Sequence, residues 1–311
     1  MNRTQCLIMV VLIGLLLTGA VSAQQAPQPY DQVMDLVYGN AKGQDLYLDV
    51  FIPNGENRHD YFQPNDNGKG FALIDVISGG WNSRRARQEE HEQAAVFKIL
   101  CSRMYTVFAI RPGSLPDFTA EEMVDNLKRG IRWVKAHADE YGIDPDRIGV
   151  MGASAGAHLA TLTMLSVEDG DPEAKDPLER FDTSICAVGA FFPPTDFLDW
   201  DGKPADVRRE PYLAFSDGIE GKSEEEIRAA MERISPARQV KGTKTAPLLL
   251  IHGDVDPIVP LQQSQVMEKA MREAGNDVEL IVKEGGGHFW LTIPEEIIRL
   301  ADWFDKQLAE K

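Results

Sequence analysis

RIGVMGASAGAHLA, from Arg147 to Ala160, runs from a β-rich segment into an alanine-rich one, with one serine between two glycines. Gly152, Ser154 and Gly156 fit the pattern Gly-x-Ser-x-Gly at this strand-to-helix junction. Glycines allow a turn so tight that a Cβ atom would collide with the neighbouring strand or helix. The stretch therefore predicts either a nucleophilic serine projecting from a sheet edge or a small residue in a structural bend.

Short apolar runs with β-branched residues alternate with longer helical patterns along the chain. The strand-like runs are VMDLVY (33–38), DLYLDVFI (45–52), FALIDVIS (71–78), TVFAIR (106–111), RIGVMG (147–152), SICAVGAFF (184–192), APLLLIHG (246–253) and VELIVKE (278–284). The helical candidates are residues 89–104, 120–141, 155–165, 260–274 and 294–308. The alternation predicts an α/β fold, with a mostly parallel central sheet, helices on both faces and an antiparallel start.

The alternation breaks between residues 166 and 246, where an acidic loop, one strand and a charged helical piece follow each other. We expect a lid-like insertion here, before the strand at residues 246–253, that covers one end of the sheet. Thr119 with Glu122, and Ser223 with Glu226, have the spacing of helix-starting capping boxes. Residues 24–311 are predicted to form one domain that includes this insertion.

The N-terminus has the order of a cleaved secretory signal over residues 1–23. Arg3 precedes an apolar run from Cys6 to Leu17, and small residues end at Ala23. The apolar run is shorter than the ~20 residues of a spanning helix, which disfavours an uncleaved membrane anchor. We expect a secreted or periplasmic protein, cleaved before Gln24, without stable membrane insertion.

Composition excludes some partners and leaves other questions open. The formal net charge of −17 disfavours nucleic acid as a partner, because counterion release cannot drive the binding. Neither cysteines nor histidines have zinc-ligand spacing. Export would permit a disulfide between Cys101 and Cys186, and two buried free thiols fit their apolar surroundings equally well. The sequence does not indicate the oligomeric state.

A serine nucleophile needs a base, and His288 is the best placed of the six histidines. It follows Gly285–Gly287 on the loop after the last predicted strand, at the strand end where open α/β sheets bind ligands. The other histidines are expected elsewhere: His59 and His91 in charged stretches, His137 on a solvated part of a helix, His158 packed behind the nucleophile, and His252 at the end of a buried strand.

A carboxylate must orient the base, and LLLIHGDVDPIVP supplies Asp254 and Asp256 just past an apolar strand. One of the two is expected to stabilise an Asx turn instead. Pro257 stiffens the loop beside Asp256, which favours Asp256. The resulting chain order Ser154, Asp256, His288 is that of α/β-hydrolases.

These blocks resemble secreted α/β-hydrolase esterases of the acetyl-xylan, feruloyl and carboxylesterase group, close to the hormone-sensitive-lipase-like and dienelactone-hydrolase-like branches. The resemblance is carried by YGNAKGQDLYLDVFIP (38–53), SGGW (78–81), YGIDPDRIGVMGASAGAHLA (141–160), HGDVDPIVP (252–260) and GGGHFW (285–290). It implies an α/β-hydrolase fold, the second aspartate of HGDVDPIVP as the acid, and no metal or organic cofactor.

The resemblance also implies an oxyanion hole built from backbone N–H groups of Gly80 or Trp81 and of Ala155. Ser78 stands where relatives carry a histidine, and the sequence leaves open which of Gly79, Gly80 and Trp81 donates. Trp81, Phe192, Trp200 and Trp290 are predicted to bind substrate, with Phe191, Pro193 and Phe289 as further walls of the pocket.

The sequence thus predicts a serine esterase that cleaves small-molecule or polysaccharide esters, with acyl groups on carbohydrate or plant-polymer material as the expected substrates. Two other interpretations remain. One is a prolyl-oligopeptidase-like peptidase, although such enzymes usually carry a large propeller domain ahead of the hydrolase domain, and here only a short segment separates the predicted signal from the first strand. The other is a non-catalytic binding module on the same fold, against which the complete Ser/Asp/His set argues.

Overall fold

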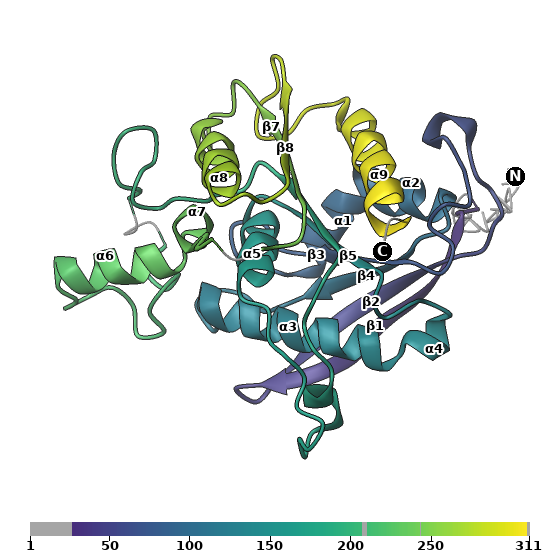
Figure 1. Ribbon diagram of the computed structural model, residues 1–311, viewed down its shortest axis with the longest axis horizontal. Coiled ribbons are helices and arrows are strands. Elements are labelled where there is room, and N and C mark those ends of the chain that lie inside the picture. Colours follow the sequence, from purple (N-terminus) through teal and green to yellow (C-terminus); the bar gives the residue numbers. More distant parts are fainter. Residues whose placement is uncertain (1–26, 207–209, 243, 310–311) are drawn as a thin grey trace, which may run out of the picture.

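The computed structural model describes residues 27–206, 210–242 and 244–309, and the predicted signal at residues 1–23 lies outside them. Eight strands form one central sheet in the described chain (Figure 1). They are β1 (Tyr30–Ala41), β2 (Gln44–Pro53), β3 (Ala72–Val76), β4 (Thr106–Arg111), β5 (Ile148–Ala153), β6 (Ala187–Phe191), β7 (Leu248–Gly253) and β8 (Val278–Lys283). Each corresponds to one predicted run, so the prediction of the strands is confirmed.

The strand order is β1-β2-β4-β3-β5-β6-β7-β8. β1 and β2 pair antiparallel, β2 pairs antiparallel with β4, and the remaining neighbours are parallel. The predicted fold class, a mostly parallel sheet with an antiparallel start, is therefore confirmed. The chain leaves β3 toward β4 on one side and returns to β5 on the other, so β3 and β5 flank a topological switch point, where open sheets form a crevice at their carboxyl ends.

The helices largely follow the apolar periodicity of the sequence. They are α1 (Arg85–Gln93), α2 (Val96–Ser102), α3 (Ala120–Ala136), α4 (Ala138–Tyr141), α5 (Ala155–Leu165), α6 (Glu224–Arg233), α7 (Pro236–Gln239), α8 (Gln262–Glu273) and α9 (Ile293–Ala309), with 3-10 turns η1 (Asp60–Phe62) and η2 (Pro177–Arg180). Both predicted capping boxes are present, at Thr119 and Ser223. In the described part of the chain, no helix is long and apolar enough to cross a membrane.

Two predicted helices are each divided in the structure. The helix expected over residues 89–104 is wrong as one element, because Ala95 takes a left-handed conformation (φ 64°) between α1 and α2. The helix expected over 120–141 is interrupted at His137, whose φ of −106° and ψ of 15° lie outside the α-helical region. Neither break is marked by glycine or proline, the usual helix breakers.

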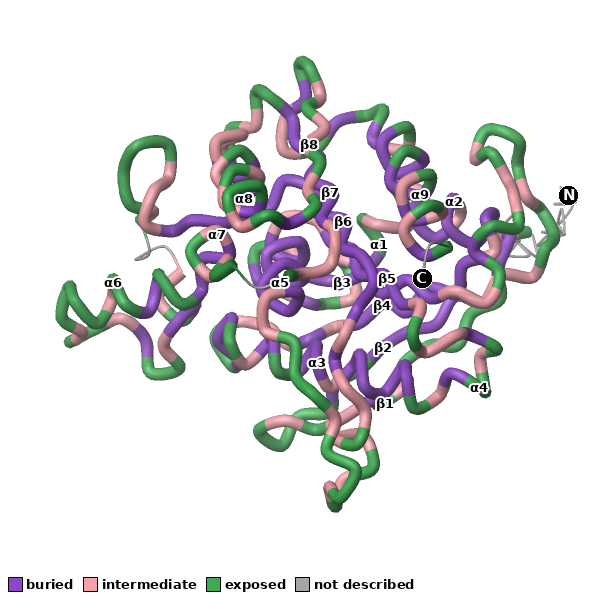
Figure 2. The backbone as a smooth tube through the Cα atoms, in the orientation of Figure 1, coloured by how far each residue is buried: buried purple, intermediate pink, exposed green. Residues whose placement is uncertain are grey.

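Helices cover both faces of the sheet, so alternate residues of each strand enter different cores. On β3 and just beyond it, Leu73 and Ile77 pack in the core that includes α2 and α9, whereas Ile74 and Val76 pack in the core that includes α3 and α5. Strands β3 to β7 are buried along most of their length, whereas the edge strands β1 and β8 are mostly exposed or half-buried (Figure 2). Burial on both faces explains why the central strands read as continuous apolar runs.

The segment between residues 166 and 246 contains η2, the sheet strand β6, α6 and α7. α6 lies at the left edge of the molecule in Figure 1, and of its residues only Ala230 and Met231 are buried. The expected insertion is therefore part sheet and part peripheral helix, and its role as a lid stays a prediction. Cys101 and Cys186 are both buried free thiols, which settles the question of their pairing.

Candidate active site

The turn from β5 to α5 holds Ser154 at φ 53° and ψ −119°, a conformation that costs an ordinary residue free energy. Its two glycines are sterically required. A Cβ atom on Gly152 would lie 2.5 Å from the carbonyl carbon of Gly156, and one on Gly156 would lie 2.3 Å from the Val76 oxygen. The turn therefore presses the start of α5 against the end of β3 and projects Ser154 at the sheet edge.

Ser154, His288 and Asp256 lie in one chain of hydrogen bonds. Ser154 Oγ is 3.0 Å from His288 Nε2, and His288 Nδ1 is 2.7 Å from Asp256 Oδ2. The His288 ring packs against Phe192, with 4.5 Å between ring centroids. An Nδ1–H donated to the carboxylate leaves the Nε2 lone pair facing the serine hydroxyl, as a general base requires.

Asp256 is fixed from both sides. Its Oδ1 accepts hydrogen bonds from the amides of Ile258 (2.8 Å) and Val259 (2.9 Å). Burial by itself raises the pKa of Asp256, but hydrogen bonds with His252, His288 and these amides outweigh it and lower the pKa well below its ordinary value. The carboxylate therefore stays ionised at neutral pH.

Asp254 has a different function in the same loop. Its Oδ1 accepts a hydrogen bond from the Gly285 amide at 2.7 Å, which ties the loop after β7 to the loop that carries His288. The structure thus brings Asp256, and not Asp254, to the imidazole. The expected division of roles is therefore wrong in one respect: Asp256 itself makes the Asx-type bonds to the amides of Ile258 and Val259, and Asp254 joins two loops instead.

The loop after β3 makes a two-residue turn beside the nucleophile. Gly79 and Asn82 exchange backbone hydrogen bonds (3.0 and 3.2 Å), and Gly80 and Trp81 between them have φ of 55° and 53°. Because the Gly79 amide is used in this turn, it is no longer a candidate donor. In the described chain the amides of Gly80, Trp81 and Ala155 have no protein acceptor, so they are free to bind an anion.

A buried histidine attaches this turn to the rest of the protein. Trp81 Nε1 donates to His158 Nδ1 at 3.0 Å, and His158 Nε2 lies 2.7 Å from the Ile234 carbonyl. Burial lowers the pKa of His158 to about 4, although the bond to the Ile234 carbonyl acts in the opposite direction. A neutral ring, donating through Nε2 and accepting through Nδ1, satisfies both bonds, and His158 packs behind Ser154 as predicted.

A cavity of about 660 Å³ contains Ser154 and His288. Trp81, Phe192 and Trp200 line it, as do Phe191 and Phe289. The prediction for Trp290 is wrong, because its buried indole is not in this lining and donates to Glu296 on α9 at 2.7 Å instead. Pro193 is also absent from the lining, where the neighbouring Pro194 is found.

The cavity has a polar wall that the sequence did not reveal. His91 lines it from α1, and His91 Nδ1 is 2.7 Å from Oδ2 of Asp75, a fully buried residue of β3. The sequence placed His91 in a charged, solvated stretch. Asp75 within the apolar run FALIDVIS was the available signal, since a buried carboxylate needs a partner.

Residues 60–271 match the family described as BD-FAE. The chain belongs to the BD-FAE family. Of its relatives, this BD-FAE chain is 27% identical to esterase LipQ of Mycobacterium tuberculosis, over 83% of the chain and 58% of LipQ. It is 25% identical to isoprenylcysteine alpha-carbonyl methylesterase ICME of Arabidopsis thaliana, over 77% of the chain and 55% of that protein. The BD-FAE chain thus spans a little over half the length of these relatives.

Solved structures share the fold. A truncated carbohydrate esterase from gut microbiota aligns with a TM-score of 0.74 at 22% identity, covering 91% of this BD-FAE chain and 99% of that one. A butyrate-bound thermophilic esterase from Thermogutta terrifontis aligns with a TM-score of 0.61 at 26% identity, covering 87% and 92%. The α/β-hydrolase fold of the BD-FAE chain is therefore shown.

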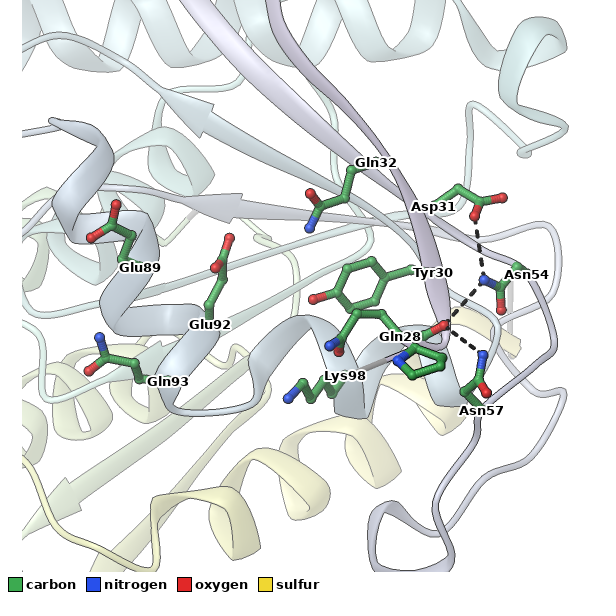
Figure 3. A pocket seen from close by; sticks show the side chains of 11 residues that line it. Gln28, Tyr30, Asp31, Gln32, Asn54, Asn57, Glu89, Glu92, Gln93 and Lys98 are labelled. Atoms are coloured by element: carbon green, nitrogen blue, oxygen red, sulfur yellow. Dashed lines mark hydrogen bonds between the residues drawn. The ribbon is translucent and has the colours of Figure 1, made fainter. Parts of the chain in front are cut away.

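A larger hollow, about 790 Å³, lies against the other side of α1 (Figure 3). Its labelled side chains are polar or charged, and Asn54 and Asn57 both donate to the Gln28 backbone oxygen at 3.3 Å. None of its lining residues is a serine, cysteine or histidine. The hydrogen-bonded Ser154 and His288 line the smaller cavity. Within the described ranges, no group of three or more His, Cys, Asp or Glu residues could hold a metal ion.

Replacing Trp81 with phenylalanine tests the attachment of the turn in this BD-FAE protein. Trp81→Phe leaves the buried His158 Nδ1 without its donor, and an unsatisfied buried acceptor costs about 1–3 kcal/mol. We expect the free energy of unfolding, measured by urea denaturation, to fall by about 2 kcal/mol. Trp200→Phe makes the same change of ring without removing a buried hydrogen bond, so equal losses in the two variants would contradict the assignment.

Proposed function

We propose that this chain is a carboxylic ester hydrolase that uses Ser154 as nucleophile, His288 as general base and Asp256 as its orienting acid. One observation carries the proposal: the continuous hydrogen-bonded series from Ser154 through His288 to Asp256, inside a cavity at the carboxyl edge of the sheet. The esterase names of the curated relatives support it.

The reaction takes place in two steps. Ser154 Oγ attacks the ester carbonyl while its proton passes to His288 Nε2, and Asp256 stabilises the imidazolium. As the tetrahedral intermediate collapses, His288 returns the proton to the leaving alcohol and an acyl-serine remains. Water then repeats the sequence with His288 as base and releases the acid. The nucleophile, the base and the acid in this scheme are all side chains of the protein.

The oxyanion of the intermediate is held by the amide of Ala155 and an amide of Gly80 or Trp81. The turn between Gly79 and Asn82 positions these donors before substrate arrives, so little reorganisation is needed in the transition state. Donors of this kind come from the backbone, which explains how Ser78 can replace the histidine of similar enzymes without removing the hole.

The proposed substrates are acyl groups on carbohydrate or plant-polymer material. Trp81, Phe192 and Trp200 give the cavity aromatic walls, which suit the apolar face of a sugar or an aromatic acyl group. A carbohydrate esterase is among the proteins with the same fold. A panel of acetyl, feruloyl and longer-chain esters measures the acyl preference, and proline-containing peptide amides in the same panel test the peptidase alternative.

Ser154→Ala should reduce ester turnover by about 10⁶-fold, because loss of the nucleophile removes the whole covalent mechanism. A fluorophosphonate probe should label the wild-type protein at Ser154 and leave the variant unlabelled. Ordinary esterase activity in the variant would reject the proposed mechanism, and an unlabelled wild-type protein would favour a non-catalytic binding module.

Asp256→Asn and Asp254→Asn form a matched pair of neighbouring substitutions. In Asp256→Asn the new side-chain amide can donate to Nδ1 and favour the wrong tautomer of His288, so we expect kcat to fall by about 10⁴-fold. In Asp254→Asn the side-chain carbonyl can still accept the hydrogen bond from Gly285, so kcat should stay within about threefold of wild type. Steady-state kinetics on one ester measure kcat of both variants. A larger fall of kcat in Asp254→Asn than in Asp256→Asn would reverse the assignment.

We also propose export, on the basis of the signal pattern in residues 1–23. The full chain, expressed with an intact secretion pathway, should appear in the periplasm or medium with Gln24 as its first residue. N-terminal sequencing measures this directly. Protein that keeps Met1 and stays in the cytoplasm would refute the proposal.

A further inference from the structure

The polar wall of the catalytic cavity is one face of α1 and the residue that follows it. Arg87, Glu90, His91 and Ala94 all line the cavity, and their spacing of three and four residues places them on one side of the helix. Glu89 is exposed and lines the separate hollow of Figure 3. His91, held on the regular helix α1, therefore lines the same cavity as Ser154.

Asp75 fixes the orientation of the His91 ring. Asp75 is fully buried, and its Oδ2 binds His91 Nδ1 at 2.7 Å, so this nitrogen is occupied. In the part of the chain that the structure describes, His91 Nε2 has no protein hydrogen-bond partner, and the His91 side chain retains 13% exposure. Nε2 is thus the polar atom that His91 can offer to a ligand.

The surroundings leave His91 Nε2 able to hydrogen-bond a ligand in either protonation state of the ring. Burial by itself lowers the pKa of His91, but the Asp75 carboxylate, with a smaller contribution from Glu90, outweighs it and raises the pKa above its ordinary value. With the Nδ1 proton donated to Asp75, Nε2 accepts from a ligand hydroxyl when the ring is neutral and donates to it when the ring is protonated.

The charges around His91 favour a neutral ligand. Asp75 pairs with His91, and Arg87 pairs with Glu90 on the same helix face. Glu210, whose pKa is raised by burial, also lines the cavity and disfavours an anion. Donors and acceptors that stand side by side match hydroxyl groups, each of which both donates and accepts.

His91 has no part in activating Ser154. The serine hydroxyl already has His288 Nε2 at 3.0 Å, and no hydrogen bond joins it to His91 in the described chain. Two carboxylate–imidazole pairs therefore share one cavity, and only one of them contacts the nucleophile. The other is available for binding.

We propose that Asp75 and His91 form a hydroxyl-binding subsite of the catalytic cavity, in which His91 Nε2 forms a hydrogen bond with a hydroxyl on the polyhydroxylated part of an ester substrate. Asp75 acts through His91 and is a positioning residue. The inference rests on the proposed esterase function. It extends that function because such a subsite selects sugar-like esters over esters of simple alcohols with the same acyl group.

Two substitutions distinguish two roles of His91. In one role Nε2 forms a hydrogen bond with substrate, and in the other His91 only satisfies the buried Asp75 carboxylate. The side-chain amide of His91→Asn mimics Nδ1, so this variant keeps a donor to Asp75 and lacks the Nε2 position. The amide of His91→Gln mimics Nε2 instead. The measured quantity is kcat/KM for glucose monoacetate divided by kcat/KM for n-hexyl acetate, two substrates that share the acetyl group.

We expect this ratio to fall about tenfold in His91→Asn, since one hydrogen bond to the substrate is lost, and less than threefold in His91→Gln. The loss should lie mainly in KM, as expected for a binding contact. Glu89→Gln, on the same helix but outside the cavity, should keep the wild-type ratio. Urea denaturation of each variant verifies that it is folded.

A folded His91→Asn variant with the wild-type ratio would overturn the subsite and assign His91 a structural role only. The subsite would also be rejected if the wild-type protein hydrolysed n-hexyl acetate and not the sugar ester. Failure of the esterase function itself is a different result: neither ester is cleaved, and fluorophosphonate does not label Ser154 in the wild-type protein.

Discussion

The turn between β5 and α5 holds a serine in a backbone conformation that most residues avoid, and the site is arranged around it. Gly152 and Gly156 leave no room for a Cβ atom, so α5 starts in direct contact with β3. That contact also fixes the turn between Gly79 and Asn82, because the Gly156 amide donates to the Ser78 carbonyl at 2.9 Å. The steric demand of one turn thus places Ser154 and the free amides of Gly80 and Trp81 just beyond the ends of adjacent strands.

The topology of the sheet supplies the remaining groups. β3 and β5 are neighbours although β4 separates them in sequence, and the loops after β7 and β8 reach the same edge with Asp256 and His288. Each functional side chain therefore follows its own parallel strand, where the carboxyl ends form a common crevice. Secondary contacts make the arrangement rigid: Asp254 joins the two later loops, and His158 joins Trp81 to the Ile234 carbonyl just after α6.

The sequence predicted the features that depend on local chemistry. Strand runs, capping boxes and the bounds of α5 follow from periodicity and from side chains that satisfy nearby amides. It did not predict features that arise from tertiary contact. Ala95 ends a helix without a breaker residue, and Trp290 turns toward a carboxylate on α9 that sequence spacing does not reveal. The Asp75–His91 pair joins a strand to the helix that returns over it, so only the folded chain brings the two residues into one cavity.

The central claim is that Ser154 becomes covalently acylated during turnover. Rapid acid quench of the protein with excess p-nitrophenyl acetate, followed by digestion and mass spectrometry, measures this directly. The account predicts an acetyl group on the peptide that contains Ser154, formed at the rate of the initial nitrophenol release. Turnover without an acyl adduct, or an adduct on another residue that forms at the rate of turnover, would contradict it.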